Sequence, residues 1–297
     1  MMSKIKTWLK VIIRKVLGAF GFYSPFNNPQ QGARTAFVNN VFGHKLYQNV
    51  DDIAVDYSPL SGMQLADLGV KLKDGEMEFI ARELRPGDTV IDIGANVGLM
   101  TLLLAKVVGP TGSVIAFEPG PTSFAILKLN TLINNYKNVT LVNKAVSSAS
   151  GTETLFICPT GESDNQVSMT DLGWEDEIRI AVPIETVSLD DYFINGSDQK
   201  IDFIKIDTQG GEYKALNGMK NLLVRNQDIR LTIEYAPYLP LWKDLEPQEF
   251  IGFIRSLGFK IYDLNNGNPQ LASDEYLLTA YPKNGAARKM TSLLLSR

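Results

Sequence analysis

Cysteine and histidine are nearly absent from this chain of 297 residues, which has one cysteine, Cys158, and one histidine, His44. A single cysteine cannot form an internal disulfide and provides no metal cluster, so the simplest compartment is a reducing one. A single histidine excludes a histidine-rich metal centre and argues against a Ser-His-Asp hydrolase. We therefore predict no metal site, and we interpret His44 as a surface or strand-end residue.

The chain also has no strong excess of charge of either sign. Its net charge of −4 gives no sign of general nucleic-acid affinity. Its 44% hydrophobic content is ordinary for a globular protein that buries a core. We therefore expect no nucleic acid as a partner.

Acidic residues are missing from the first twenty positions, which carry only basic charges: Lys4, Lys6, Lys10, Arg14 and Lys15. On a helix the apolar residues of this segment share one face, whereas Arg14 and Lys15 interrupt any apolar core of a signal peptide. The segment is too charged to span a bilayer. Residues 1–20 either lie on an anionic membrane surface or pack on their own domain. We expect a cytoplasmic protein, free or peripheral on the inner face of the membrane.

A glycine loop between a strand and a helix is the most informative stretch. Residues 89–93 are predicted to form a buried parallel strand, and Leu99 to Val108 a packed helix, with Gly94 and Gly98 in the loop between them. A dinucleotide fold would need a glycine where Asn96 stands. The buried carboxylate of Asp92 repels phosphate but suits a cationic ammonium or sulfonium. The loop resembles the first motif of S-adenosylmethionine-dependent methyltransferases; the alternative is an ordinary glycine turn.

A second acidic position follows the next predicted strand, residues 113–117. Glu118, which is followed by Pro119, stands where a dinucleotide or adenosine fold places an acid that accepts hydrogen bonds from both ribose hydroxyls. After the helix 122–134 and the strand 139–143, the loop from Asn143 to Ala145 is placed to frame an adenine.

The remaining chain predicts a β insertion and a return to parallel strands. Residues 154–158 and 178–184 are expected to pair antiparallel around the polar loop 160–171. The segment Ser188 to Asp191 has the form of a capping box, so its acids are expected to be structural. Further elements are a strand at 201–206, a helix at 213–224, a strand at 229–233, a helix at 247–257, a hairpin of 259–264 with 276–281, and a loosely ordered tail from Lys283.

Five ordered blocks together resemble the FkbM-type methyltransferase family. They are Asp92 to Gly98, Ala116 to Pro119, Ser188 to Asp191, Asp202 to Gly210, and Ile233 with Glu234. The resemblance covers roughly residues 75–282. It implies a class I methyltransferase fold: a Rossmann-like, mostly parallel sheet with an antiparallel C-terminal hairpin and the β insertion. It also implies S-adenosylmethionine as cofactor and O-methylation of hydroxyls on sugars, glycans or polyketides.

The resemblance also assigns site residues. The cofactor loop would comprise Asp92, Gly94, Ala95, Asn96 and Gly98, with Glu118 and Pro119 at the ribose, Asn143 and Ala145 at the adenine, and Asp207 at the fourth strand.

The catalytic base, on this resemblance, would be Asp207, with Glu212 or Glu234 second. Whether Asp207 takes the hydroxyl proton or only orients the amino group of the cofactor stays open. Many members of the family carry glutamate in the loop after this aspartate. Gln209 departs from that pattern and weakens any case for a divalent metal there.

Two other functions remain possible from the sequence. One is a nicotinamide-dependent oxidoreductase on a Rossmann sheet, against which Asn96 and the antiparallel end argue. The other is a catalytically silent binding subunit with a degenerate cofactor pocket. Near Glu234, the aromatic residues Tyr235, Tyr238 and Trp242 either stack on a sugar or pack at the sheet edge.

The chain divides into four predicted parts: a basic amphipathic helix (1–26), a cap or acceptor-side region (27–74), the methyltransferase domain (75–283) and a C-terminal tail (284–297).

Overall fold

The computed structural model describes residues 35–41, 44–49, 75–157, 180–194, 199–239, 242, 244–284 and 289–297. The predicted N-terminal helix, most of the predicted cap region, Cys158 and the loop 160–171 lie outside the described residues. Their proposed roles, including membrane contact through residues 1–20, stay predictions. In the described ranges, no helix is both long and apolar enough to cross a bilayer.

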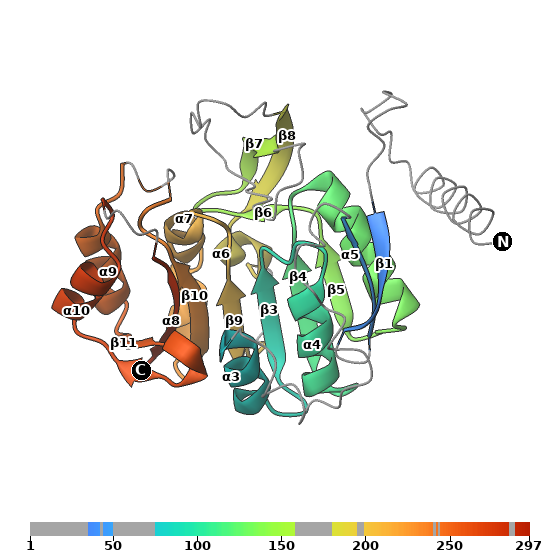
Figure 1. Ribbon diagram of the computed structural model, residues 1–297, viewed down its shortest axis with the longest axis horizontal. Coiled ribbons are helices and arrows are strands. Elements are labelled where there is room, and N and C mark those ends of the chain that lie inside the picture. The colour runs from blue at the N-terminus through green and yellow to red at the C-terminus, as the bar shows by residue number, and fades with distance from the viewer. Residues whose placement is uncertain are drawn as a thin grey trace.

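An eight-stranded sheet organises the described chain, in the order β12-β11-β13-β10-β9-β3-β4-β5 (Figure 1). Its strands are β3 (Thr89–Ile93), β4 (Ser113–Phe117), β5 (Val139–Val142), β9 (Phe203–Ile206), β10 (Arg230–Tyr235), β11 (Lys260–Asp263), β12 (Gln270–Leu271) and β13 (Thr291–Ser296). The five strands from β10 to β5 are parallel, whereas β13 runs antiparallel to both β10 and β11. The predicted Rossmann-like, mostly parallel sheet is therefore confirmed.

Helices cover both faces of this sheet because its central strands are apolar on both sides. On one face, α3 (Gly75–Glu83) and α4 (Leu99–Val108) pack on Val90, Val114 and Phe203, and α5 (Pro121–Ile133) packs on Ala116. On the other face lie α6 (Leu189–Tyr192), α7 (Glu212–Asn217), α8 (Lys220–Arg225) and α9 (Pro247–Ser256).

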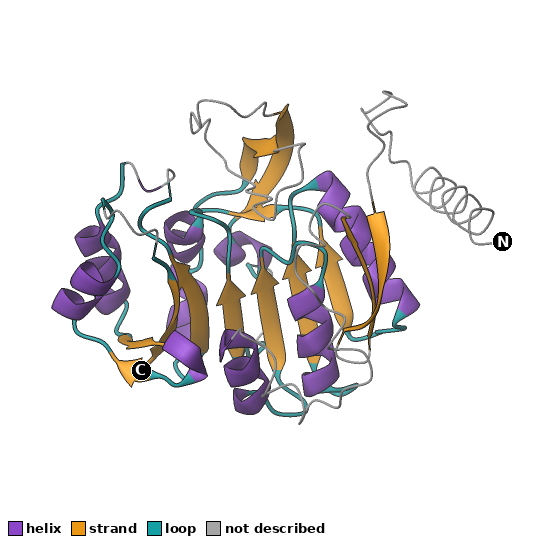
Figure 2. Cartoon of the chain, viewed as in Figure 1, coloured by secondary structure: helices purple, strands orange, loops and turns teal. Residues whose placement is uncertain are grey.

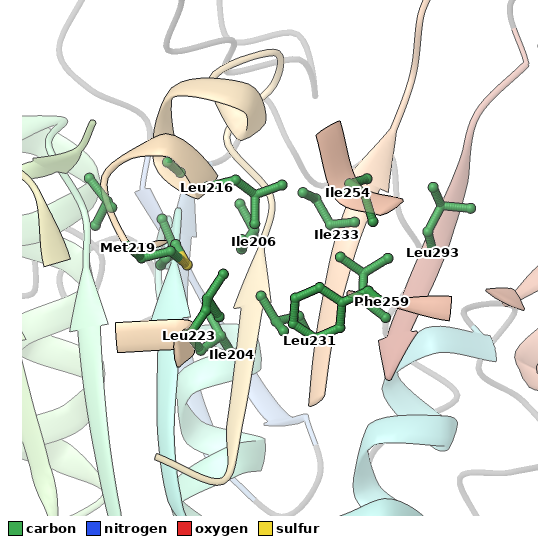
Figure 3. Close-up of a cluster of buried hydrophobic side chains, with 14 of the residues drawn as sticks. Ile204, Ile206, Leu216, Met219, Leu223, Leu231, Ile233, Ile254, Phe259 and Leu293 are labelled. Carbon is green, nitrogen blue, oxygen red and sulfur yellow. The ribbon is translucent and has the colours of Figure 1, made fainter. Parts of the chain in front are cut away.

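The core of the second face is drawn in Figure 3, where leucines of α7 and α8 point toward Ile204 and Ile206 of β9. These isoleucines are fully buried. Burial of a side chain of this size is worth about 1.5–3 kcal/mol. The apolar packing of β9 on both faces therefore fixes the strand that carries Asp207 at its end.

A small sheet stands beyond the carboxyl ends of the parallel strands (Figure 2). In it, β7 (Gly151–Ile157) pairs antiparallel with β8 (Ile180–Val187), and β6 (Ala145–Val146) pairs parallel with β8. The predicted antiparallel insertion is confirmed. An ion pair of 2.8 Å between Lys214 of α7 and Glu153 of β7 ties this small sheet to the main domain.

A separate hairpin near the N-terminus pairs β1 (Thr35–Val41) with β2 (His44–Asn49). His44 begins β2, which is the predicted strand-end position.

The prediction of one continuous helix over residues 213–224 is wrong, because the helix is interrupted between α7 and α8. Gly218 lies so close to the backbone of Ser147 that an added Cβ would stand 2.0 Å from the carbonyl oxygen. Asp190 then accepts hydrogen bonds from the first-turn N–H groups of Asn221 and Leu222 in α8. The Ser188 hydroxyl accepts from the Asp191 N–H, so the N-cap half of the predicted capping box is confirmed, whereas the Ser188 N–H donates to the Ser150 hydroxyl and not to Asp191.

The predicted C-terminal hairpin and tail are also wrong. Residues 276–281 do not form a strand, because α10 (Asp274–Ala280) begins there with a Ser273 cap. Strand β11 pairs instead with β12 on one side and with β13 on the other, and the leucines of β13 at 293–295 fill the space between β10 and β11. A strand inserted between two others is buried, so residues 291–296 are part of the sheet and not a loose tail.

Candidate active site at the carboxyl edge of the sheet

Five parallel strands bring the predicted site residues into one row. Strand register pairs the apolar residues that come just before them: Ile233, Ile206, Ile93, Phe117 and Val142. The residues that follow this apolar row are Glu234, Asp207, Gly94, Glu118 and Asn143. Open α/β sheets bind ligands beyond the carboxyl ends of their strands. The row therefore lies where a ligand of this fold is expected.

The glycine loop uses left-handed backbone at three positions, Gly94, Asn96 and Gly98, with φ of +79°, +49° and +97°. Gly94 is needed for close approach, because an added Cβ would stand 1.8 Å from the carbonyl oxygen of Asp207. The Asn130 amide of α5 supports the loop by donating to the Val97 carbonyl at 2.6 Å. Gly94 thus joins the ends of β3 and β9, and the loop is fixed before any ligand arrives.

Asp92 lies fully buried beneath this loop. Its Oδ2 accepts a 2.6 Å hydrogen bond from the Thr101 hydroxyl of α4, while Oδ1 has no hydrogen-bond partner. Burial raises the pKa of Asp92, and the nearby Lys205 ammonium opposes that rise.

Lys205 is the site residue that sequence reasoning missed. Its buried ammonium lies 3.2 Å from Asp207 Oδ2 and 3.8 Å from Asp92 Oδ1. Burial acts to lower the pKa of Lys205, but the attraction of Asp207 and Asp92 prevails and the net pKa is raised. A lysine within an apolar strand is the signal that could have revealed it, because a buried charge needs a buried partner.

Glu118 is 3% exposed and already holds two backbone groups. Its Oε2 accepts from the Asn96 N–H at 2.8 Å, and its Oε1 accepts from the Gly120 N–H at 2.7 Å. Burial raises the pKa of Glu118 to about 7 against the effect of these two N–H donors. Each carboxylate oxygen has further lone-pair capacity, so a diol can still bind.

Asn143 supports Glu118 from the next strand. Its amide donates to the carbonyl oxygens of Glu118 at 2.8 Å and Pro119 at 3.2 Å. Ala145 is buried in β6, where it pairs with Thr186. The adenine-framing role predicted for Asn143 and Ala145 stays a prediction.

Asp207 has both carboxylate oxygens engaged although its side chain is 38% exposed. Oδ2 faces Lys205, and Oδ1 accepts from the Gln209 amide at 3.0 Å. The same Gln209 Nε2 donates to Glu234 Oε1 at 3.2 Å. One amide therefore joins the carboxylates at the ends of β9 and β10.

Glu212 is buried and holds the loop after Asp207. Its Oε1 accepts from the Thr208 N–H, the Thr208 hydroxyl and the Gly210 N–H, at 2.9, 2.9 and 3.0 Å. Burial raises the pKa of Glu212, and these loop donors oppose that rise. The contacts assign Glu212 to anchoring the loop, which leaves Asp207 and Glu234 as candidate bases.

Glu234 is 7% exposed, and its Oε2 is buried without a hydrogen-bond partner. Burial holds the pKa of Glu234 well above its ordinary value; Asp207 and Glu212 add to the rise, and Lys205 opposes it.

The aromatic residues beyond Glu234 belong mainly to the core. Tyr235 and Trp242 are buried, with ring centroids 5.5 Å apart, and both pack on Phe250. Tyr238 is half-buried, and its hydroxyl contacts Met290. The sequence left two roles open for these aromatic residues, stacking on a sugar or packing at the sheet edge. The contacts of Tyr235 and Trp242 fit packing. Over the described ranges, no three His, Cys, Asp or Glu side chains gather so that they could hold a metal.

Comparison with known proteins gives one family for most of this domain. Residues 92–261, more than half of the chain, match the family model described as "Methyltransferase FkbM domain". The 31-O-demethyl-FK506 methyltransferase FkbM of Streptomyces tacrolimicus is 52% identical over 71 residues, which cover 20% of this chain and 27% of that protein. The hexuronic acid methyltransferase AglP of Haloferax volcanii is 26% identical over 147 residues, which cover 50% of this chain and 56% of that protein.

The curated relatives are matched over only 27% to 63% of their own length. Among solved structures, a SAM-dependent O-methyltransferase from Thermotoga maritima aligns with a TM-score of 0.40 at 14% identity. That alignment covers 90% of this chain and 79% of the other. No conclusion about a substrate follows from a likeness at this score.

Proposed function

This chain belongs to the methyltransferase FkbM domain family, and we propose that it transfers a methyl group from S-adenosylmethionine to a hydroxyl of a sugar or glycan. Membership of a methyltransferase family decides against the nicotinamide-dependent oxidoreductase. The observation that carries the proposal is the row in which Asp207 and Glu234 stand beside the Gly94 loop and Glu118.

The residues present fit the cofactor. Glu118 retains acceptor capacity for a ribose diol between two fixed N–H contacts. The loop from Gly94 to Gly98 brings backbone, without side-chain bulk at the glycines, to the N-terminus of α4. Asp92, Asp207 and Glu234 place carboxylates at this edge, and the Lys205 ammonium beside them is already paired with Asp92 and Asp207, which suits a cation better than a pyrophosphate. Together these features suit a ribose and a cation.

When bound, S-adenosylmethionine supplies a methyl group on a positively charged sulfonium. The chain must align the acceptor oxygen and exclude water, because these factors dominate such a displacement. As the new O–C bond forms, the O–H bond of the acceptor breaks and its proton needs a receiving group. Asp207 and Glu234 are the two carboxylates placed to receive it. Orientation of the amino group of the cofactor remains the alternative role for Asp207.

The acceptor class is drawn from two observations. Two relatives are named for methylation of demethyl-FK506 and of a hexuronic acid. The small sheet of β6, β7 and β8 stands over the carboxyl edge, where an acceptor would approach (Figure 2). The names support a hydroxyl-bearing small molecule or glycan as the partner, and the small sheet offers a surface that could contact it.

The test uses the full chain, methyl-labelled S-adenosylmethionine, and a panel of neutral sugars, uronic acids and macrolide alcohols. The expected result is an acceptor whose mass rises by one methyl group, with an equal amount of S-adenosylhomocysteine. Asp207→Asn should lose roughly 10²–10⁴ in turnover even at saturating cofactor if Asp207 receives the proton. If it anchors the cofactor, affinity should fall and saturating cofactor should restore the rate. Binding of cofactor without transfer to any acceptor would favour a silent subunit.

A further inference from the structure

The loop after β9 holds an uncommon backbone conformation at Gln209. This residue has a φ of +56°, although it is not glycine. Such strain persists only where the surroundings enforce it, and it is concentrated at functional sites. Glu212 supplies the enforcement by accepting hydrogen bonds from Thr208 and Gly210 on either side of Gln209. The backbone from which the Gln209 side chain extends is therefore set by the fold.

That amide links two carboxylates that would otherwise repel each other. Gln209 Nε2 donates to Asp207 Oδ1 at 3.0 Å and to Glu234 Oε1 at 3.2 Å. Both N–H groups of one amide thus serve the pair, and Glu234 Oε2 remains without a partner in the buried edge of the site. A buried carboxylate oxygen without a donor is costly, so an unfilled interaction points to a ligand.

The charges around Glu234 are mostly negative. Asp207 on the β9 end, Glu212 of α7 and Glu76 of α3 act on it from neighbouring elements, and among the described residues Lys205 opposes them. The Lys205 ammonium is already placed between Asp207 and Asp92. The Glu234 side therefore keeps an excess of negative charge that a bound cation would offset.

We infer that Gln209 is a positioning residue that holds Glu234 and Asp207 as a pair which distinguishes the cationic cofactor from its neutral product. This inference rests on the proposed function, because it requires S-adenosylmethionine as the ligand. Loss of the methyl group turns the sulfonium into an uncharged sulfide, so the attraction to the pair is present before transfer and absent after it. The pair thus favours entry of the cofactor and exit of the product.

A proton change accompanies this selectivity. In the free protein, burial raises the pKa of Glu234, so it holds a proton to a higher pH than an ordinary glutamate. A bound cation stabilises the ionised form and lowers that pKa. Binding of S-adenosylmethionine therefore releases protons. The affinity of the protein for S-adenosylmethionine consequently rises with pH as Glu234 loses its proton. S-adenosylhomocysteine carries no sulfonium and causes no such release.

Titration calorimetry on the full chain tests the inference without an acceptor. The ligands are S-adenosylmethionine, S-adenosylhomocysteine, and sinefungin, in which an amine supplies the charge. Each is measured at about pH 6 and pH 8 in two buffers of different ionisation heat, which reports the protons released. The two charged ligands should release protons and bind more tightly at the higher pH, and S-adenosylhomocysteine should do neither.

Two variants and a control locate the effect. Glu234→Gln should lower the affinity for S-adenosylmethionine roughly ten- to hundredfold, as expected for the loss of one interaction with a charged group, and leave the affinity for S-adenosylhomocysteine unchanged. Gln209→Leu removes the amide donors and should reduce the preference for S-adenosylmethionine over S-adenosylhomocysteine. Glu249→Gln, at an exposed position of α9, changes the net charge equally and should have no effect.

The outcomes separate the two proposals. Wild-type protein that binds neither S-adenosylmethionine nor S-adenosylhomocysteine would overturn the proposed function and this inference together. Wild-type protein that binds both ligands without proton release overturns only the inference, and this measurement needs no variant to fold. An unchanged affinity ratio in folded Glu234→Gln would likewise overturn it.

Discussion

Glu118 illustrates how one side chain both shapes the site and binds the expected ligand. Its two oxygens fix the N–H groups of Asn96 and Gly120, which positions the cofactor loop against the end of β4. The same oxygens face the place where a ribose is expected. We therefore expect the carboxylate to serve binding as well as the local backbone.

Replacing Glu118 with alanine should weaken S-adenosylmethionine binding by roughly ten- to hundredfold, since a hydrogen bond to a charged group is worth about 1.5–3 kcal/mol. Calorimetry measures the affinity, and Glu118→Gln is the control that keeps one acceptor oxygen for the loop. Unchanged affinity in a folded Glu118→Ala protein would remove this residue from the cofactor site.

Gly94 and Gly109 form a matched pair for testing close approach. Both have positive φ, but an added Cβ meets the Asp207 carbonyl at Gly94 and nothing within 4 Å at Gly109. Gly109→Ala should cost about 1–3 kcal/mol from backbone strain alone. Gly94→Ala should cost more than about 4 kcal/mol or prevent folding. Urea unfolding gives both values, and equal losses would contradict the contact between β3 and β9.

At the scale of elements, the C-terminal strand β13 is held by a buried carboxylate on its neighbour β11. Asp263 accepts hydrogen bonds from the hydroxyls of Tyr276, Tyr281 and Thr291 and from the N–H of Asn265. These donors come from α10, the segment after it, β13 and the turn after β11. Asp263 therefore joins the last elements of the chain to the sheet.

Thr291→Val should lower the free energy of unfolding by about 1.5–3 kcal/mol, because it removes the 2.6 Å hydrogen bond to the Asp263 carboxylate. Thr291→Ser keeps the hydroxyl and should lose much less. Chemical denaturation of both variants measures the difference, and equal stability of the two would show that the hydroxyl contributes nothing to holding β13.

At the scale of the molecule, burial raises the pKa of four carboxylates in the part of the chain that the structure describes: Asp92, Glu118, Glu212 and Glu234. The folded protein consequently holds more protons than the unfolded chain once the pH exceeds the ordinary glutamate value. The stability gained from this protonation is fully present below that value and is lost as the pH rises through the raised pKa. For Glu118 the window runs from 4.5 to about 7.

The free energy of unfolding should therefore fall by on the order of 1–3 kcal/mol between about pH 5 and pH 7, given about 1.4 kcal/mol per pH unit for each net proton. Urea unfolding of the ligand-free protein at constant ionic strength measures the trend. Glu118→Gln should make the dependence shallower. Stability that stays flat or rises over this range would contradict the raised pKa values.

The sequence by itself determined the parallel α/β pattern, the glycine loop and the acids Asp92, Glu118 and Asp207. These features are local: apolar runs report strands buried on both faces, and residues just after such strands must lie at the carboxyl edge of the sheet.

Tertiary structure decided how those local pieces meet. It placed the Lys205 ammonium between Asp92 and Asp207. It also made Glu212 a hydrogen-bond acceptor for the loop after β9 and brought the Gln209 amide into contact with Glu234. It also inserted β13 between β10 and β11, although its sequence predicted a tail. These contacts join residues far apart along the chain, and strand order rather than local pattern selects which of them become neighbours. The physical reason is that a strand pattern encodes burial, whereas the partner that satisfies a buried charge or backbone group is fixed only when the sheet assembles.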